Sequence, residues 1–133
     1  MKKIVFIYFL LITNQVFAID LSVEFDKCMK SAITNSNFSS CNQKEINYQE
    51  KQLSKAWKNL SVEIKQVSLN AYKELLTEQK LWIKYKDSAC NYFSVEEDNM
   101  YVFGHEGNSL HYGSCKANII AERVKHLNNT LPR

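Results

Sequence analysis

The sequence predicts an all-α fold: a small, disulfide-stapled domain built on a long antiparallel helical hairpin, with a short first helix and a C-terminal helix. Three observations support this. The 133 residues include only three glycines and one proline, and none of them lies between residues 19 and 103, so the chain has few sharp turns. Apolar residues recur at helical spacing. The four cysteines form an even number in a short chain, which is typical of a disulfide framework.

The N-terminus has the features of a cleavable export signal. Two lysines precede an apolar run over residues 4–12, and Val16 and Ala18 follow it. Small residues at these two positions predict cleavage after Ala18, so that Ile19 begins the mature chain. The run is too short to span a bilayer, which needs about 20 residues. We therefore expect a periplasmic or secreted protein without stable membrane anchoring.

Removal of residues 1–18 leaves a single domain over residues 19–133. The mature chain has 15 basic and 14 acidic residues, a formal charge of +1. Such a balance provides no basic surface for nucleic acid or an anionic membrane. We expect neither as a partner.

The cysteines are expected to pair locally, Cys28 with Cys41 and Cys90 with Cys115, although four cysteines permit three pairings. Local pairs close the shortest loops. A zinc site is the rival interpretation, but it would require close C-x-x-C pairs, and the sequence has none.

The first helix is expected over residues 22–33, followed by a polar loop over residues 34–40. Ser40 and Gln43 have the spacing of a capping box, which predicts that the second helix begins there. Its apolar stripe comprises Ile46, Leu53, Ala56, Leu60, Ile64 and Val67.

Ser68 or Asn70 is expected to cap a third helix, which would form an antiparallel hairpin with the second. One continuous helix is the alternative, which we disfavour because nothing would cover its apolar seam. All three glycines fall in a loop over residues 91–114. The last helix is expected over residues 114–129, with Pro132 just beyond it.

Several of these residues have the spacing of a known family. The motifs are Leu53-x-x-Ala56-Trp57-x-x-Leu60, then Gln79-x-x-Trp82-x-x-x-Lys86-Asp87-x-x-Cys90, then a glycine-bearing loop, Cys115, Arg123 and Leu127. From Cys28 to Leu127 the chain resembles the LprI-like lysozyme-inhibitor family of bacterial envelope proteins. It departs from the family at Lys86, where arginine is usual, and at Ile120, where threonine is common.

The motif residues are interpreted as structural. Trp57 and Trp82 fall on facing helices and could share a core. Gln79 and Asp87 could bind the backbone or Arg123, and a buried Asp–Arg pair would tie the last helix to the hairpin.

The sequence shows no enzyme signature. We expect the cysteines to be oxidised, so they offer no nucleophile, and no P-loop, nucleophile elbow or dinucleotide motif occurs. Asp98, His105, Glu106 and His111 could form a metal site, but their spacing matches no established ligand pattern. We expect neither a metal nor a cofactor.

The loop between Cys90 and Cys115 is the expected contact surface for a protein partner. It contains four acidic residues and no lysine or arginine. Tethering at both ends would reduce the entropy lost on binding. The proposed contact residues are Glu96, Glu97, Asp98, Tyr101, Phe103, His105 and Glu106. A plainer interpretation is that the aromatic residues complete a small core and the acidic residues keep the loop soluble.

The resemblance implies that the protein blocks a peptidoglycan-cleaving lysozyme by protein–protein contact. Animal lysozymes are basic, so an acidic loop suits this role. The mature domain as a whole is not acidic, however. A periplasmic immunity or adaptor protein that binds a toxin or another envelope protein is therefore the alternative.

Overall fold

The structure, a computed structural model, describes residues 20–130 and confirms the all-α fold. The predicted signal over residues 1–18 and Pro132 lie outside the described residues. The elements in order are α1 (Val23–Ser31), α2 (Asn35–Val67), α3 (Leu69–Ser88), the 3₁₀ turn η1 (Asn91–Ser94), β1 (Glu96–Glu97), β2 (Met100–Tyr101), α4 (Gly104–Glu106), the π-helical turn η2 (Gly107–Tyr112) and α5 (Gly113–Thr130).

The second helix begins earlier than the sequence indicated. The predicted start at Ser40 was wrong: α2 begins at Asn35 and is capped by Thr34. The backbone N–H of Asn37 donates to the Thr34 hydroxyl, and the Thr34 N–H donates to the Asn37 side chain, each at 3.2 Å. This reciprocal cap fixes the first turn. Serine and asparagine dominate residues 35–40 and have low helix propensity, which is why the local sequence suggested a loop.

The hairpin forms at a single residue. Ser68 is the C-cap of α2 and the N-cap of α3, and its hydroxyl accepts a hydrogen bond from the Ala71 N–H at 3.2 Å. Because Ser68 is extended, with φ −157° and ψ 120°, the chain reverses there instead of continuing as one helix. The predicted hairpin is confirmed, and Ser68 is its connecting residue.

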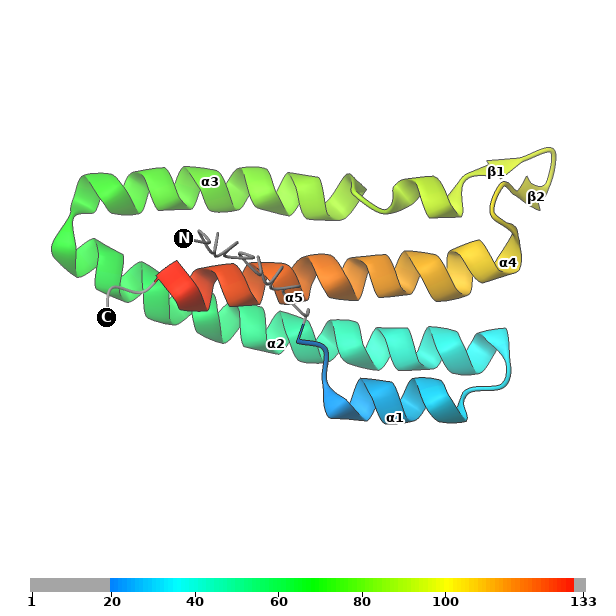
Figure 1. The fold of residues 1–133 in the computed structure, drawn as a ribbon. Coiled ribbons are helices and arrows are strands. Elements are labelled where there is room, and N and C mark those ends of the chain that lie inside the picture. The colour runs from blue at the N-terminus through cyan, green and yellow to red at the C-terminus, as the bar shows by residue number, and fades with distance from the viewer. Residues whose placement is uncertain (1–19, 131–133) are drawn as a thin grey trace, which may run out of the picture.

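The last helix, α5, lies between the two arms of the hairpin (Figure 1). It packs chiefly along α2 and touches α3 much less. Ala56 and Leu60 from α2 and Leu127 from α5 form a buried cluster. Trp57 and Leu53 are among the half-buried residues that pack against this cluster. The hairpin therefore remains open, and α5 supplies the core that joins its arms.

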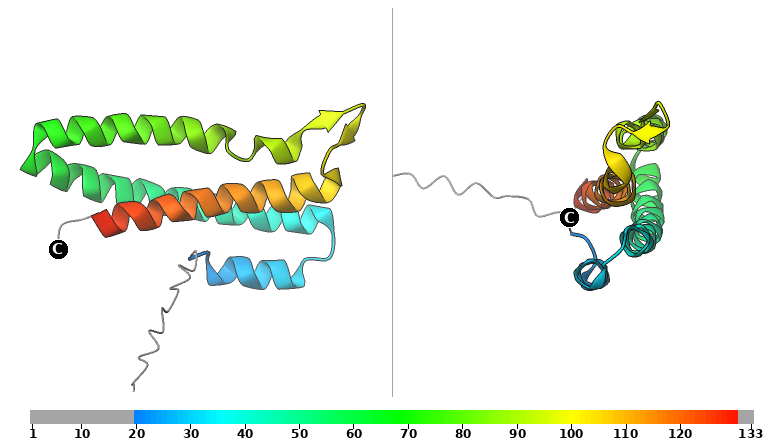
Figure 2. Two further views of the ribbon diagram at one scale, coloured as in Figure 1. Left: turned by 45° about the horizontal axis from the view of Figure 1, so that its top comes forward. Right: turned by 90° about the vertical axis from the view of Figure 1, so that its right-hand side faces the viewer.

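Helix α1 packs against α2 on the side away from α3 (Figure 2). Its N-cap Ser22 is tied to α2, because both the N–H and the hydroxyl of Ser22 donate to the carboxylate of Glu45. Glu45 is almost fully buried, at 2% exposure. It also accepts a hydrogen bond from Gln49 at 2.8 Å. These neutral donors replace the water that burial removes.

Both predicted disulfides are confirmed. Cys28–Cys41 joins α1 to the beginning of α2, and Cys90–Cys115 joins the end of α3 to α5. The second bond spans 25 residues, and both β-strands and the 3₁₀ turn of the described residues lie between its two cysteines.

Candidate functional site

The candidate site is the segment 91–112, which we call the finger. It contains η1, β1, β2, α4 and η2. It forms one end of the molecule, where the open side of the hairpin lies (Figure 1). The Cys90–Cys115 bond closes its base. The finger is therefore a pre-folded projection and not the open loop that the sequence suggested.

A two-residue β-hairpin forms the tip of the finger. Glu96 pairs with Tyr101 and Glu97 with Met100 in antiparallel register. The turn residues Asp98 and Asn99 have positive φ values of 51° and 62°. Aspartate and asparagine adopt this left-handed conformation more readily than other non-glycine residues, and it matches the twist of a tight hairpin. The Asp–Asn pair was a signal for this turn, and the sequence analysis missed it.

An aromatic cluster supports the tip. The Phe93 ring lies 4.2 Å from Tyr92, 5.6 Å from Phe103 and 5.6 Å from His111, measured between ring centroids. These contacts join η1 to η2 and to the end of the hairpin. Gly107 allows this packing, because a Cβ atom there would come within 2.3 Å of the Phe103 Cβ. Part of the aromatic content therefore packs within the finger, although none of these four rings is buried.

Other side chains of the finger remain exposed. Met100 is 71% exposed, and Tyr92, Val95, Val102 and Phe103 are 41–53% exposed. Such a concentration of large apolar side chains at one end of a small domain is typical of an interaction surface. Of the predicted contact residues, Phe103 belongs to this group. Met100, Val95 and Val102 were not predicted as contacts.

The predicted acidic residues border these apolar side chains. Glu96 and Glu97 are exposed on β1, Asp98 is exposed in the turn, and Glu106 is exposed on α4. No lysine or arginine lies between Cys90 and Cys115 to offset them. We call the exposed acidic and apolar residues together the finger surface: Tyr92, Val95, Glu96, Glu97, Asp98, Met100, Val102, Phe103 and Glu106.

Tyr101 and His105 are placed differently from the rest of the predicted contacts. Successive side chains of a strand point to opposite faces, so Tyr101 points away from Met100, its neighbour in β2. Its ring meets the His105 ring edge-on at 5.4 Å. Both side chains line a cleft between the finger and the start of α2.

The buried side chain of Asn42 anchors the finger to α2. Its amide nitrogen donates to the carbonyl oxygens of Ser109 at 2.7 Å and Leu110 at 3.3 Å. Its amide oxygen accepts from the Ser114 hydroxyl at 3.1 Å. Gly113 makes this approach possible, since a Cβ atom there would lie 2.6 Å from the Asn42 side chain.

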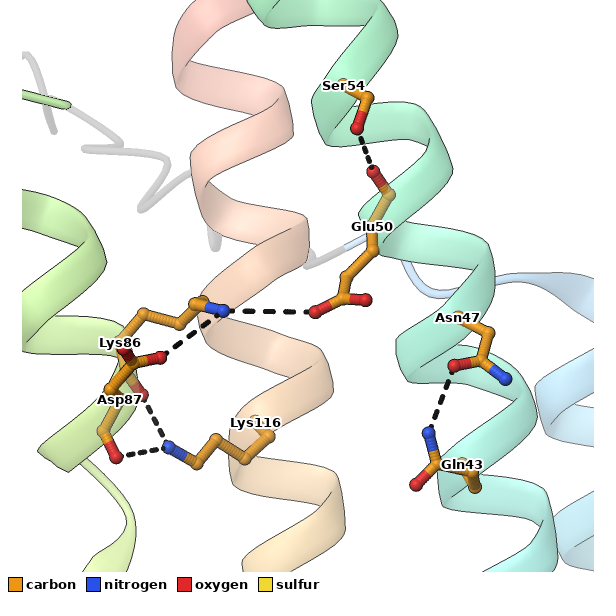
Figure 3. A network of polar contacts seen from close by, with 7 residues as sticks. All are labelled: Gln43, Asn47, Glu50, Ser54, Lys86, Asp87 and Lys116. Atoms are coloured by element: carbon orange, nitrogen blue, oxygen red, sulfur yellow. Dashed lines mark hydrogen bonds and ion pairs between the residues drawn. The ribbon is translucent and has the colours of Figure 1, made fainter. Parts of the chain in front are cut away.

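Charged contacts hold the three long helices together near the base of the finger (Figure 3). The ammonium of Lys116 on α5 donates to the carbonyl oxygens of Lys86 and Asp87, which end α3. The Lys86 ammonium lies 3.4 Å from the Asp87 carboxylate and 3.8 Å from that of Glu50 on α2. Burial lowers the pKa of Lys116. These contacts fix the position from which the finger projects.

The predicted link between α5 and the hairpin exists, but its carboxylate is Glu78. Arg123 is buried and donates to the two Glu78 carboxylate oxygens at 2.6 and 2.9 Å. It also donates twice to the Gln79 side-chain oxygen, at 3.0 and 2.7 Å. Asp87 is exposed and lies beside Lys86 instead, because it sits two turns further along α3.

The two tryptophans have different surroundings. Trp57 packs against the α2–α5 core. Trp82 lies over Arg123, with 5.5 Å between the guanidinium carbon and the ring centroid, a distance at which cation–π attraction operates. The motif residues Gln79, Trp82 and Arg123 therefore form one contact between α3 and α5, outside the finger.

This contact predicts a pH dependence of stability. Hydrogen bonds from Arg123 hold the pKa of Glu78 below its ordinary value. A carboxyl group whose pKa is lower in the folded than in the unfolded state stabilises the fold at pH values above the unfolded-state pKa, which is near 4.3 for glutamate. That stabilisation is lost as the pH falls through the folded-state pKa. Below about pH 4.3, the free energy of unfolding should therefore fall less steeply for Glu78→Gln than for the parent. Urea unfolding at several pH values across this range measures the free energy of unfolding.

The control is Glu74→Gln, a change at an exposed residue of the same helix, which should keep the parental pH dependence. If Glu74→Gln flattened the pH dependence equally, the effect would not come from the Glu78–Arg123 contact.

The described residues show no arrangement for metal binding or membrane crossing. Within residues 20–130, no group of three histidine, cysteine, aspartate or glutamate side chains could hold a metal ion. No helix in that range is long and apolar enough to cross a membrane.

Comparison with known proteins gives one match. The family model of the lysozyme inhibitor LprI matches residues 28–127. No curated protein and no solved structure matches the chain. The matched range begins at the first cysteine and includes both disulfides, the Arg123 contact and the whole finger. The chain belongs to the LprI lysozyme-inhibitor family.

Proposed function

We propose that the protein is a binding protein that blocks a peptidoglycan-cleaving lysozyme by contact through the finger surface. Two disulfides and the family indicate an extracytoplasmic protein. We further propose that the signal is cleaved after Ala18, which releases the domain into the periplasm or the medium. The intact mass of the exported protein would show whether the chain begins at Ile19.

One observation carries this proposal: a pre-folded projection presents exposed apolar side chains beside acidic ones. The acidic residues would attract a basic enzyme and speed encounter. Met100 and Phe103 would then be buried in the contact and slow dissociation. Because the disulfide and the Asn42 hydrogen bonds already order the finger, little further ordering would oppose binding.

A lysozyme activity assay tests the proposal directly. Purified, oxidised protein should inhibit a basic lysozyme in proportion to complex formation, and the inhibition should weaken as salt is added. If no lysozyme is inhibited, the proposal is wrong, and the immunity or adaptor function becomes the better hypothesis. The charge of the mature chain favours that alternative, since a uniformly acidic surface would suit a basic enzyme better.

The apolar part of the finger surface should control dissociation. Phe103 is 50% exposed, so Phe103→Ala removes contact area from the interface. We expect dissociation to be about tenfold faster, with little dependence on salt, because lost apolar contact is not screened. Surface plasmon resonance measures both rates. Tyr85→Ala, which removes a similarly exposed ring on α3 (57%), is the control and should leave dissociation unchanged. A strongly salt-dependent effect of Phe103→Ala would contradict this role.

A further inference from the structure

A cleft of about 500 Å³ lies between the first turns of α2 and the helical part of the finger. Its size falls within the range of roughly 300–1,000 Å³ that small-molecule sites occupy. Amides, hydroxyls and aromatic rings make up most of its lining, and no aspartate, glutamate, lysine or arginine belongs to it. The cleft therefore has a mixed polar and apolar lining without a carboxylate, ammonium or guanidinium group, unlike the acidic finger surface.

Some of the amides that line the cleft have unused hydrogen-bonding capacity. The Asn42 amide nitrogen donates to the finger backbone and its oxygen accepts from Ser114, and Gln43 donates to Asn47 at 3.0 Å. The side chains of Asn35 and Asn108 make no hydrogen bond to any residue in the described range 20–130. Each of these amides offers two donors and one acceptor. Asn35 comes from α2 and Asn108 from the finger, so a ligand in the cleft could bind both sides.

Aromatic rings complete the lining. The rings of Tyr101 and His105 pack edge to face, and the Tyr112 ring lines the cleft from η2. Rings of this kind bind the apolar C–H faces of a ligand, while the phenol hydroxyls remain available to polar groups. A ligand that matches this lining has both C–H faces and many neutral hydroxyl or amide groups, and it carries no charge that would need a counterion.

We propose that this cleft binds an uncharged saccharide of about disaccharide size. Sugar rings present C–H faces to aromatic side chains and neutral hydroxyls to amides. A charged ligand would lose hydration without gaining an ion pair, and a purely apolar ligand would displace water from the amides without replacing its hydrogen bonds. This activity goes beyond lysozyme inhibition, because the cleft and the finger surface are lined by different side chains.

A titration of the ¹⁵N-labelled, oxidised protein, exported from its full-length chain, tests the proposal. The probes are chitobiose and maltose, two uncharged disaccharides with and without acetamido groups. We expect saturable shifts of the amide signals from the cleft residues with at least one of them. Asn108→Ala should weaken binding roughly three- to tenfold, the effect of one lost neutral hydrogen bond.

A matched pair of tryptophan variants locates the site. Ser39 and Ser40 are adjacent exposed residues of α2, and only Ser39 lines the cleft. Ser39→Trp should fill the cleft and abolish binding, whereas Ser40→Trp should bind as the parent does. Unchanged amide spectra away from the substitution show that each variant folds. Absence of saturable shifts with both sugars, or equal loss of binding in both variants, would overturn the proposal.

Discussion

Replacing Glu96, Glu97 and Glu106 together with lysine is expected to slow association with a basic lysozyme by tens-fold or more at low salt. All three carboxylates are exposed on the finger, and no basic residue between Cys90 and Cys115 offsets them. The change alters the local charge by about six units, so attraction becomes repulsion. Because exposed charges are screened over about 10 Å at 0.1 M salt, the defect should shrink as salt rises. Stopped-flow or surface plasmon resonance measures the association rate.

Asp98 is left unchanged in this variant for a structural reason. Its φ of 51° lies in the left-handed region, where lysine is less readily accommodated than aspartate. A lysine there would strain the turn and could disturb the hairpin. The three glutamates have no such constraint, so a change in rate would report on charge alone.

The matched control carries the same change in net charge at sites away from the finger: Glu63→Lys, Glu74→Lys and Glu122→Lys. These glutamates are exposed on α2, α3 and α5. If local charge steers the partner, the control should associate at close to the parental rate. If the finger variant inhibits as well as the parent at low salt, the finger is not the inhibitory surface. Equal defects in both triple variants would instead indicate a non-specific effect of net charge.

The second large effect is expected from removing the disulfide at the base of the finger. Replacing Cys90 and Cys115 with serine should lower the free energy of unfolding by about 3.5 kcal/mol, the chain-entropy value for a loop of this length. This is a large share of the roughly 5–15 kcal/mol that stabilises a typical domain. Urea unfolding measures the loss. Inhibition should also weaken, because the finger would have to be ordered on binding.

The other disulfide supplies the control. Replacing Cys28 and Cys41 with serine should cost about 3 kcal/mol, since its loop is shorter. That bond joins α1 to α2, and its removal leaves both the Cys90–Cys115 bond and the Asn42 hydrogen bonds to the finger in place while α2 stays folded. The two variants should therefore lose similar stability, but only the Cys90/Cys115 variant should lose affinity under conditions where both are folded. Parental affinity in that variant would show that the disulfide does not pre-organise the finger.

The sequence by itself determined the features that depend on residues close to one another along the chain. The scarcity of glycine and proline and the helical spacing of apolar residues predicted an all-α fold. Ser68 was one of two predicted caps for the third helix, and the structure shows it in that position. The local pairing of the cysteines followed from the short loops that it closes, and both disulfides are confirmed. The family motifs likewise predicted the family that the comparison shows.

Two predictions of local structure were wrong, each in a segment where the sequence signal for the observed structure is short. Residues 35–40 have the composition of a loop, yet they form the first turns of α2, because Thr34 and Asn37 cap each other and Cys41 is tied to α1. The finger was expected to be a loop, yet Asp98 and Asn99 close a hairpin within it. Each signal involves only a few residues and lacks the periodicity that makes a long helix recognisable.

The tertiary structure alone decided which residues meet across helices. The family motifs indicated a structural role for Gln79 and Arg123, but only the position of α5 relative to α3 showed that Glu78, and not Asp87, is the carboxylate partner of Arg123. The cleft is a similar case, since it joins Asn35 to Asn108 across 73 positions of sequence. A helix places its side chains by a fixed local geometry, whereas the contact between two helices depends on how their surfaces pack along their whole length.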